Sequence, residues 1–269
     1  MNRILGYALV LIPIAALLGY GAYVEPNRLE VTRHTVGTTT TPADIRIVQI
    51  SDLHLQQMDD IRRLVAHQTV AAKPDVIVLS GDIVDRKESL AALGAFLDEL
   101  GPIPKIAVLG NWEYWSEIDL KTLAELYARH HTQLLINACQ VIEIRHKTIA
   151  FVGLDDALAS KPNAGKAGKH CADTSAKVLI EHSPGFFGKP MDQPAENAPY
   201  LLSLSGHTHG GQITLFGSPL ETPPGSGAYQ QGWYETQYGK LYVSRGIGTT
   251  VVPLRIGAEP ELPIFDIKL

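Results

Sequence analysis

Carboxylate, imidazole and amide side chains gather in five short clusters along the chain, and each cluster follows an apolar run. The five clusters are Asp52-Leu53-His54, Gly81-Asp82-Ile83-Val84-Asp85, Gly110-Asn111-Trp112-Glu113, Glu181-His182 and Gly206-His207-Thr208-His209. Oxygen and nitrogen ligands without a thiolate suit Mn²⁺, Fe or Zn²⁺. One such cluster alone is typical of a cap or a turn, but five in one chain indicate a metal site.

The apolar runs before the clusters predict strands. These runs occupy residues 45–50, 76–79, 105–109, 177–180 and 200–204. Helical patterns at 58–72, 89–100 and 118–131 follow the first three of these runs in turn, which indicates βαβ units. Ligands bind beyond the carboxyl ends of the strands in such sheets, so we expect the clusters to meet at one edge.

The second half of the chain has more strand and less helix. Further strands are expected at 141–145, 148–154, 239–244 and 264–268, and Gly-rich loops at 159–174 and 217–232. The predicted fold class is α/β, a four-layer α/β/β/α sandwich of two mixed sheets.

The order D-x-H, G-D-x-x-D, G-N-x-E, H and G-H-x-H resembles that of the calcineurin-like metallophosphoesterases, and the resemblance covers nearly all of the chain after Ala43. Residues 206–212, 243–249 and 253–255 look like a membrane-anchored or exported bacterial branch of that family. The branch includes cell-envelope phosphoesterases and the UDP-2,3-diacylglucosamine pyrophosphatases of lipid A synthesis. The resemblance therefore implies a phosphohydrolase that cleaves a phosphodiester or phosphoanhydride of a small-molecule or lipid substrate.

The resemblance also implies two divalent cations, Mn²⁺ first and Fe or Zn²⁺ as alternatives. One ion would be bound by Asp52, His54, Asp82 and His209, and the other by Asp82, Asn111, His182 and His207. Asp82 would bridge the ions, and a hydroxide shared between them would be the nucleophile. Asp85 and Glu113 are expected to orient the ligands by hydrogen bonds, although Glu113 would also suit an ordinary turn.

Trp112 departs from the family pattern, which has a His at this position. An indole N–H donates a hydrogen bond but cannot shuttle a proton at neutral pH. We therefore expect substrates with good leaving groups, and the alternative is a weak or inactive, metal-stabilised binding protein. His130 and His131 are alternative proton donors, or exposed residues at a helix end.

Arg245 and Arg255 lie among glycines near the C-terminus and are, with Trp112, the candidate substrate contacts. A planar guanidinium could hold a phosphate bidentately, or form a structural ion pair. Tyr114, Trp115 and the aromatic residues within 229–234 either form an apolar wall for the substrate or pack in the core.

Composition narrows the class of protein. The chain has 269 residues, of which 45% are hydrophobic, which suits one catalytic domain. A net charge of −5 and a pI near 6.0 disfavour nucleic acid as a partner. Cys139 and Cys171 are the two cysteines, and they form either a disulfide or two ordinary thiols.

Residues 4–24 carry no charge and are long enough for a transmembrane helix. We favour this interpretation over a cleaved signal peptide or a buried helix. It predicts a membrane anchor at 1–25, a linker or edge segment at 26–43 that includes the threonine run 38–41, and a phosphoesterase domain at 44–269. The protein would span the bacterial inner membrane once, with the side of its domain undecided.

Overall fold

The computed structural model describes residues 2–37, 43–189 and 199–269, and two six-stranded sheets dominate it. In sheet order the first sheet contains β1 (Glu30–Val36), β14 (Glu261–Ile267), β2 (Ile45–Ile50), β3 (Val76–Ser80), β4 (Lys105–Val108) and β5 (Thr132–Leu134). Strands β2 to β5 are parallel, whereas β14 runs antiparallel to β2 and parallel to β1. The last strand of the chain is thus inserted between the first two.

The second sheet is also mixed. Its order is β12 (Gly232–Thr236), β13 (Gly239–Val243), β9 (Tyr200–Ser205), β8 (Lys177–Ile180), β7 (Lys147–Gly153) and β6 (Ala138–Ile144). A separate hairpin pairs β10 (Thr214–Leu215) with β11 (Ser218–Pro219). The prediction of two mixed sheets is confirmed.

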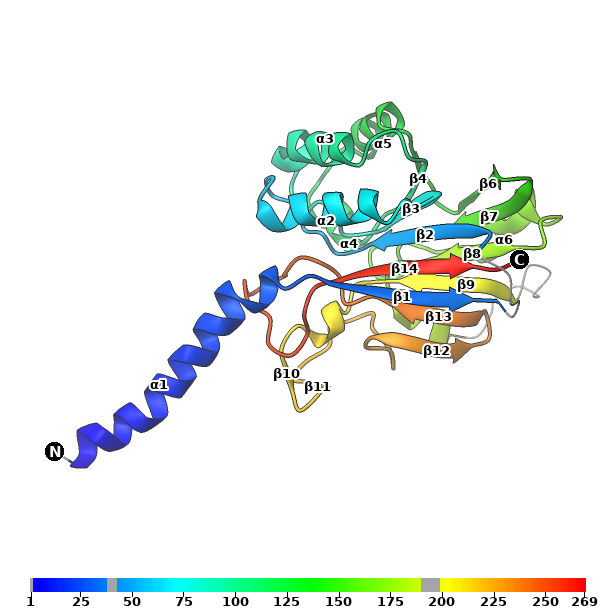
Figure 1. Cartoon of the computed structure of the whole chain (residues 1–269). Helices are drawn as coiled ribbons and strands as arrows, with labels where there is room; N and C mark the ends of the chain where they lie inside the picture. Colours follow the sequence, from blue (N-terminus) through cyan, green and yellow to red (C-terminus); the bar gives the residue numbers. More distant parts are fainter. Residues whose placement is uncertain (1, 38–42, 190–198) are drawn as a thin grey trace.

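Helices cover the outer faces of the sheets. On the first sheet these are α2 (Asp60–Ala71), α3 (Leu90–Glu99) and α5 (Leu120–Arg129), close to their predicted ranges (Figure 1). The side chains of Asp59 and Asp119 cap α2 and α5 by accepting backbone N–H groups. The second sheet carries the short helix α6 (Ala164–Gly168) and the 3₁₀ turn Pro184–Gly188, and α4 (Asn111–Trp115) follows β4.

The core lies in three layers. Ile47 and Val78 of the first sheet pack on Phe151 and Leu204 of the second, and all four side chains are buried. Each such side chain contributes about 1.5–3 kcal/mol relative to exposure. A second cluster lies under the helices of the first sheet, and a third under α6 and the 3₁₀ turn. Packing on both faces fixes the strand ends, and therefore the residues that follow them.

The N-terminal run forms one long helix, α1 (Asn2–Tyr23), which projects from the domain (Figure 1). Its last turn contacts the domain, where the carbonyl of Gly21 accepts a hydrogen bond from the Arg255 backbone N–H at 2.8 Å. Among the described residues, no helix combines the length and the apolar character that a membrane crossing requires. The predicted transmembrane helix is therefore not supported.

Part of the segment predicted as a linker or edge, residues 26–43, forms an edge strand of the first sheet. Glu30–Val36 forms β1, which pairs residue by residue with β14 at the edge of the first sheet. Glu25, just before it, is buried and accepts the Ala258 backbone N–H at 2.8 Å. The threonine run 38–41 lies outside the described residues.

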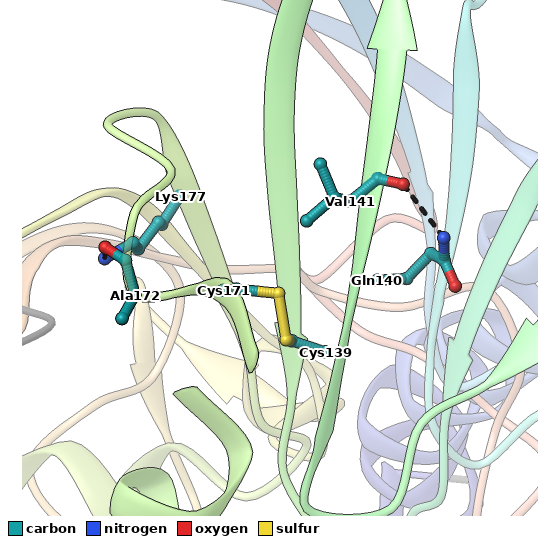
Figure 2. Close-up of a disulfide and its surroundings, with 6 residues drawn as sticks. All are labelled: Cys139, Gln140, Val141, Cys171, Ala172 and Lys177. Atoms are coloured by element: carbon teal, nitrogen blue, oxygen red, sulfur yellow. Dashed lines mark hydrogen bonds between the residues drawn. A yellow bond between two sulfur atoms is a disulfide. The ribbon is translucent and has the colours of Figure 1, made fainter. Parts of the chain in front are cut away.

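Cys139 and Cys171 form a disulfide that joins β6 to the 3₁₀ turn after α6 (Figure 2). The sequence left this bridge and two free thiols as alternatives. Because the bridge closes 32 residues of chain, it restricts the unfolded state more than the folded state.

Replacing both cysteines with serine is expected to lower the free energy of unfolding by about 3–4 kcal/mol. Urea denaturation of the oxidised wild type and the double variant measures the difference. Reduced wild type is the matched control and should unfold like the variant. Equal stability of all three proteins would contradict the role given to the bridge.

Candidate metal centre

The five polar clusters meet at the carboxyl ends of β2, β3, β4, β8 and β9, the edge predicted from the sequence. Two buried groups of side chains lie there, and within each group the ligand atoms lie within 4.8 Å of one another. We call Asp52, His54 and His209 cation site 1, and Asp82, His182 and His207 cation site 2.

Cation site 1 brings two imidazoles and a carboxylate together. His54 Nε2 lies 3.1 Å from His209 Nε2, and His209 Nε2 lies 3.4 Å from Asp52 Oδ1. Asp82 Oδ2 is 3.9 Å from His54 Nε2, so Asp82 also faces this site. Two imidazole nitrogens and two carboxylates that converge in a buried space suit a divalent cation.

Cation site 2 holds two imidazoles that are each backed by a backbone carbonyl. His182 Nδ1 lies 2.9 Å from the Ser80 carbonyl, and His207 Nε2 lies 2.7 Å from the Pro224 carbonyl. A carbonyl only accepts, so each of these nitrogens carries a proton, and in the neutral imidazole the opposite nitrogen is then the one that can bind a cation. This backing by carbonyl groups is how proteins commonly fix metal-binding histidines. Against the effect of burial, Asp82 and Asp52 raise the pKa of His182, so a cation would displace a proton from this residue.

Three buried atoms of the ligands assigned to the second ion have no hydrogen-bond partner in the described part of the chain: His182 Nε2, His207 Nδ1 and Asn111 Oδ1. His182 Nε2 lies 3.0 Å from Asp82 Oδ2 but without hydrogen-bond geometry. Buried polar atoms are rarely left unpaired, because each costs about 1–3 kcal/mol. A bound cation would satisfy all three, so these residues fit a metal ion.

The backbone is left-handed at Asp52, His54, Asp82, His207 and His209, whose φ angles lie between 42° and 71°. This conformation is uncommon for residues other than glycine and costs about 1–3 kcal/mol each where it is imposed. Asn111 and His182, by contrast, are not among the residues with positive φ. Five of the fourteen described non-glycine residues with positive φ are thus candidate ligands, and strain at such a strand edge is typical of a functional site.

Two motif glycines allow the backbone to approach the carboxylates closely. A Cβ at Gly110 would lie 2.2 Å from Asp82 Oδ1, and a Cβ at Gly206 would lie 2.3 Å from Asp52 Oδ2. The neighbouring N–H groups use this approach, since Trp112 donates to Asp82 at 2.8 Å and His207 donates to Asp52 at 2.9 Å. These bonds orient both carboxylates.

Burial changes the protonation of cation site 1. It lowers the pKa of His54 to about 4, so this imidazole is neutral at pH 7. It raises the pKa of Asp52 to about 6, opposed by His182 and by the hydrogen bond from Ser51. A proton on Asp52 therefore competes with a cation in mildly acidic solution.

We expect the affinity of cation site 1 for Mn²⁺ to fall by about tenfold between pH 7 and pH 5, because Asp52, with a pKa of about 6, gains its proton over this range. Above about pH 7 this residue contributes little further dependence. Isothermal titration at several pH values measures the effect, with Asp52→Asn as the control that removes the titrating group. Constant affinity of the wild type from pH 7 to 5 would contradict this prediction.

The Glu113 side chain binds the backbone around Asp82, the candidate bridging ligand. Its carboxylate accepts the backbone N–H groups of Asp82, Ile83, Val84 and Gly110 at 2.7–3.2 Å. Burial raises its pKa to about 7, while these four donors favour its ionised form. These contacts hold the backbone that carries Asp82, and the orienting role of Glu113 stays a prediction. Asp85, given the same role, accepts a hydrogen bond from Gln56 at 3.1 Å and pairs with Arg86.

Trp112 lies beside cation site 1. Its ring packs edge-on against His54, with centroids 5.7 Å apart, and against Trp115 at 5.9 Å. Trp115 is 56% exposed and continues the aromatic surface outward. His130 and His131 lie beyond α5, at the end of β4 away from Asn111, where the His130 carbonyl accepts a hydrogen bond from Lys105. They are thus remote from Trp112.

Both candidate arginines are engaged by protein groups. Arg245 pairs with Glu30 and lies 3.5 Å from Glu261. Arg255 is completely buried, and its N–H groups contact the carbonyls of residues 209, 245, 248 and 258. Of the two interpretations left by the sequence, these contacts favour the structural one for both residues.

A sixth junction of strand and carboxylates was missed by the sequence reasoning. Asp155 and Asp156 follow β7, and Asp155 accepts the Tyr114 hydroxyl at 2.5 Å. Asp156 accepts the Ser183 hydroxyl, next to His182, at 2.7 Å. The two aspartates thus connect the end of β7 to α4 and to the turn that contains His182. An apolar strand that runs into Asp-Asp was the available signal.

Similarity to known proteins agrees with this geometry. The model of the family Calcineurin-like phosphoesterase matches residues 45–211. The chain is 32% identical to the uncharacterized metallophosphoesterase YkuE of Bacillus subtilis, over 93% of this chain and 89% of that protein. It is 28% identical to phosphodiesterase YaeI of Escherichia coli, over 93% and 92% of the two chains. It is 26% identical to the UDP-2,3-diacylglucosamine pyrophosphatase LpxG of Chlamydia muridarum, over 96% and 94%.

The matched region contains all seven candidate ligands, from Asp52 to His209, and it includes both cation sites. Two buried ligand groups that face a shared carboxylate are the arrangement expected for two divalent cations. The chain belongs to the calcineurin-like phosphoesterase family and is a metallophosphoesterase.

Proposed function

We propose that this protein hydrolyses a phosphodiester with two divalent cations, Mn²⁺ by preference, held at cation sites 1 and 2. The observation that carries the proposal is that three buried atoms of the candidate ligands, His182 Nε2, His207 Nδ1 and Asn111 Oδ1, have no hydrogen-bond partner in the described structure. Asp52, His54, Asp82 and His209 would hold one ion, and Asp82, Asn111, His182 and His207 the other. When bound, the ions would activate water and stabilise charge on the phosphoryl oxygens.

The residues of the chain define which leaving groups suit the site. Trp112 lies against His54 and offers an indole N–H, which donates a hydrogen bond but holds no transferable proton at neutral pH. The departing oxygen must then leave without a proton from this position. Esters of acidic alcohols and phenols, and phosphoanhydrides, meet this requirement better than simple alkyl esters.

The disulfide supports a place for the domain in an oxidising compartment outside the cytoplasm. A nucleotide-linked lipid precursor of the kind named for LpxG would be met in the cytoplasm. We therefore favour a phosphodiester of the bacterial envelope with an acidic leaving group, in keeping with the name of the relative YaeI. Alkylation of free thiols after rapid lysis tests this placement. Protein with both cysteines protected supports it, and protein with two free thiols contradicts it.

The activity is tested by measuring turnover of bis-p-nitrophenyl phosphate, first after a chelator has removed the metal and then after Mn²⁺ has been added back. The expected result is turnover that chelation removes and Mn²⁺ restores, with a diester cleaved faster than a UDP-linked pyrophosphate. Binding of Mn²⁺ without turnover of either substrate would support the metal-stabilised binding protein instead. A preference for the pyrophosphate would overturn the choice of a diester.

A further inference from the structure

Arg255 lies outside the region matched by the family model and is buried directly behind cation site 1. The fork of its guanidinium reaches two parts of the site. One nitrogen, Nη1, contacts the His209 carbonyl at 3.3 Å, and Nη2 lies 3.3 Å from His209 Nδ1. The same side chain donates twice to the carbonyl of Gly248, at 3.0 Å from Nε and 2.6 Å from Nη2.

Gly248 transmits this contact to the other two ligands of cation site 1. Its N–H donates to the Asp52 carbonyl at 2.7 Å. A Cβ at Gly248 would lie 3.0 Å from the Cβ of His54 and 2.7 Å from the Leu53 carbonyl. The loop therefore lies directly against the turn that carries Asp52 and His54. All three residues of cation site 1 are thus held by Arg255, directly or through Gly248.

Cation site 2 is supported differently. His182 and His207 are backed by the carbonyls of Ser80 and Pro224, and the contacts of Arg255 in the described structure include none of these four residues. Arg255 likewise has no carboxylate among its hydrogen-bond partners in the described residues, so it is not half of an ion pair. Its geometry, more than its charge, connects it to cation site 1.

The end of α1 fixes the backbone of Arg255. The Gly21 carbonyl accepts the Arg255 N–H at 2.8 Å, and Glu25 accepts the Ala258 N–H at 2.8 Å. The Ala258 carbonyl in turn accepts a hydrogen bond from Arg255 Nη1 at 2.8 Å. The segment 21–25 therefore closes the back of cation site 1.

We propose that Arg255 is a positioning residue for cation site 1 alone, and that the end of α1 holds it in place. This inference rests on the proposed two-cation function but concerns metal binding, which can be measured without turnover. Lysine in place of Arg255 keeps the charge and loses the planar fork. The substitution should therefore loosen His209 and the Asp52–His54 turn while it leaves cation site 2 intact.

The test measures Mn²⁺ binding to the full chain by isothermal titration calorimetry and by electron paramagnetic resonance. In Arg255→Lys we expect the affinity of one site to fall by about 10–100-fold, as for other residues that support metal ligands. The other site should keep its affinity, and the spectrum of a coupled Mn²⁺ pair should give way to that of a single ion. Arg46→Lys is the matched control, because Arg46 binds Asp266 and the Ala72 carbonyl far from the site. It should bind two ions as the wild type does.

Glu25→Ala provides a second variant that leaves Arg255 itself unchanged and removes the acceptor of the Ala258 N–H, and it should weaken the same site in the same direction. Wild-type affinities at both sites in Arg255→Lys would overturn the inference, and so would equal weakening of both sites in a protein that melts like the wild type. If Arg255→Lys does not fold, Glu25→Ala decides by the same criteria. Wild-type protein that binds two ions but cleaves no ester would defeat the proposed function and leave this inference standing.

Discussion

Asp82→Asn is expected to lower Mn²⁺-dependent turnover by about a thousandfold or more, the largest loss expected for any single substitution in this chain. Asp82 is, among the described residues, the carboxylate that faces both cation sites, 3.0 Å from His182 Nε2 and 3.9 Å from His54 Nε2. Two cations held close together need an anion between them, and an amide keeps the shape of the side chain without its charge. Each site should therefore lose affinity, and the ions should repel each other.

Metal content by mass spectrometry, measured with turnover of bis-p-nitrophenyl phosphate, checks this expectation. Asp98→Asn is the control, because Asp98 is an exposed residue of α3 with the same change in charge. It should keep two ions and full turnover. An Asp82→Asn protein that retains both ions and cleaves the diester within tenfold of wild type would show that Asp82 is not the bridge.

Trp112→His is expected to raise turnover of a simple alkyl phosphodiester by about 10²-fold, the usual range for a positioned general acid. Trp112 follows Asn111 in α4 and its ring contacts His54, so an imidazole here would lie next to the candidate ligands. It could protonate the departing alkoxide, which the indole cannot. The p-nitrophenyl diester should gain little, because its leaving group needs no proton.

The ratio of the two rates, measured at equal Mn²⁺ loading, separates this effect from a change in metal content. A monoester and a pyrophosphate complete the series. Trp115→His is the matched control, since Trp115 lies in the same short helix and is largely exposed. An unchanged leaving-group profile in Trp112→His would rule out Trp112 as the cause of the preference.

The strands that lead to the site were the part of the fold most readily predicted. Ile45–Ile50 matches its predicted strand, and Val76–Ser80 and Lys177–Ile180 differ from theirs by at most one residue. These strands are buried on both faces, which gives continuous apolar runs between polar turns. Thr132–Leu134 and Gly232–Thr236 were not predicted, because edge strands are short or carry exposed polar residues and thus lack that pattern.

The candidate ligands could be named because each follows a strand and matches a family motif. Their assignment to two ions stays a prediction. The supporting roles could not be predicted in this way. Arg255 was named as a candidate substrate contact or structural ion pair, but it lies 46 positions after His209 and contacts carbonyl groups, which leave no trace in side-chain type. Asp155 and Asp156 did carry a signal, a strand followed by two carboxylates, but no family motif directed attention to it.

The insertion of β14 between β1 and β2 has a consequence for the order of assembly. Residues 261–267 pair on one side with residues 30–36, and residues 264–267 pair on the other side with residues 45–48. The first sheet therefore stays open between β1 and β2 until residues 261–267 are synthesised. Contacts between such distant parts of a chain form slowly. The candidate ligands Asp52 and His54 follow β2, next to the gap that β14 fills. A nascent chain stalled before residue 261 would therefore expose the edge of β2 beside the turn that carries these two residues.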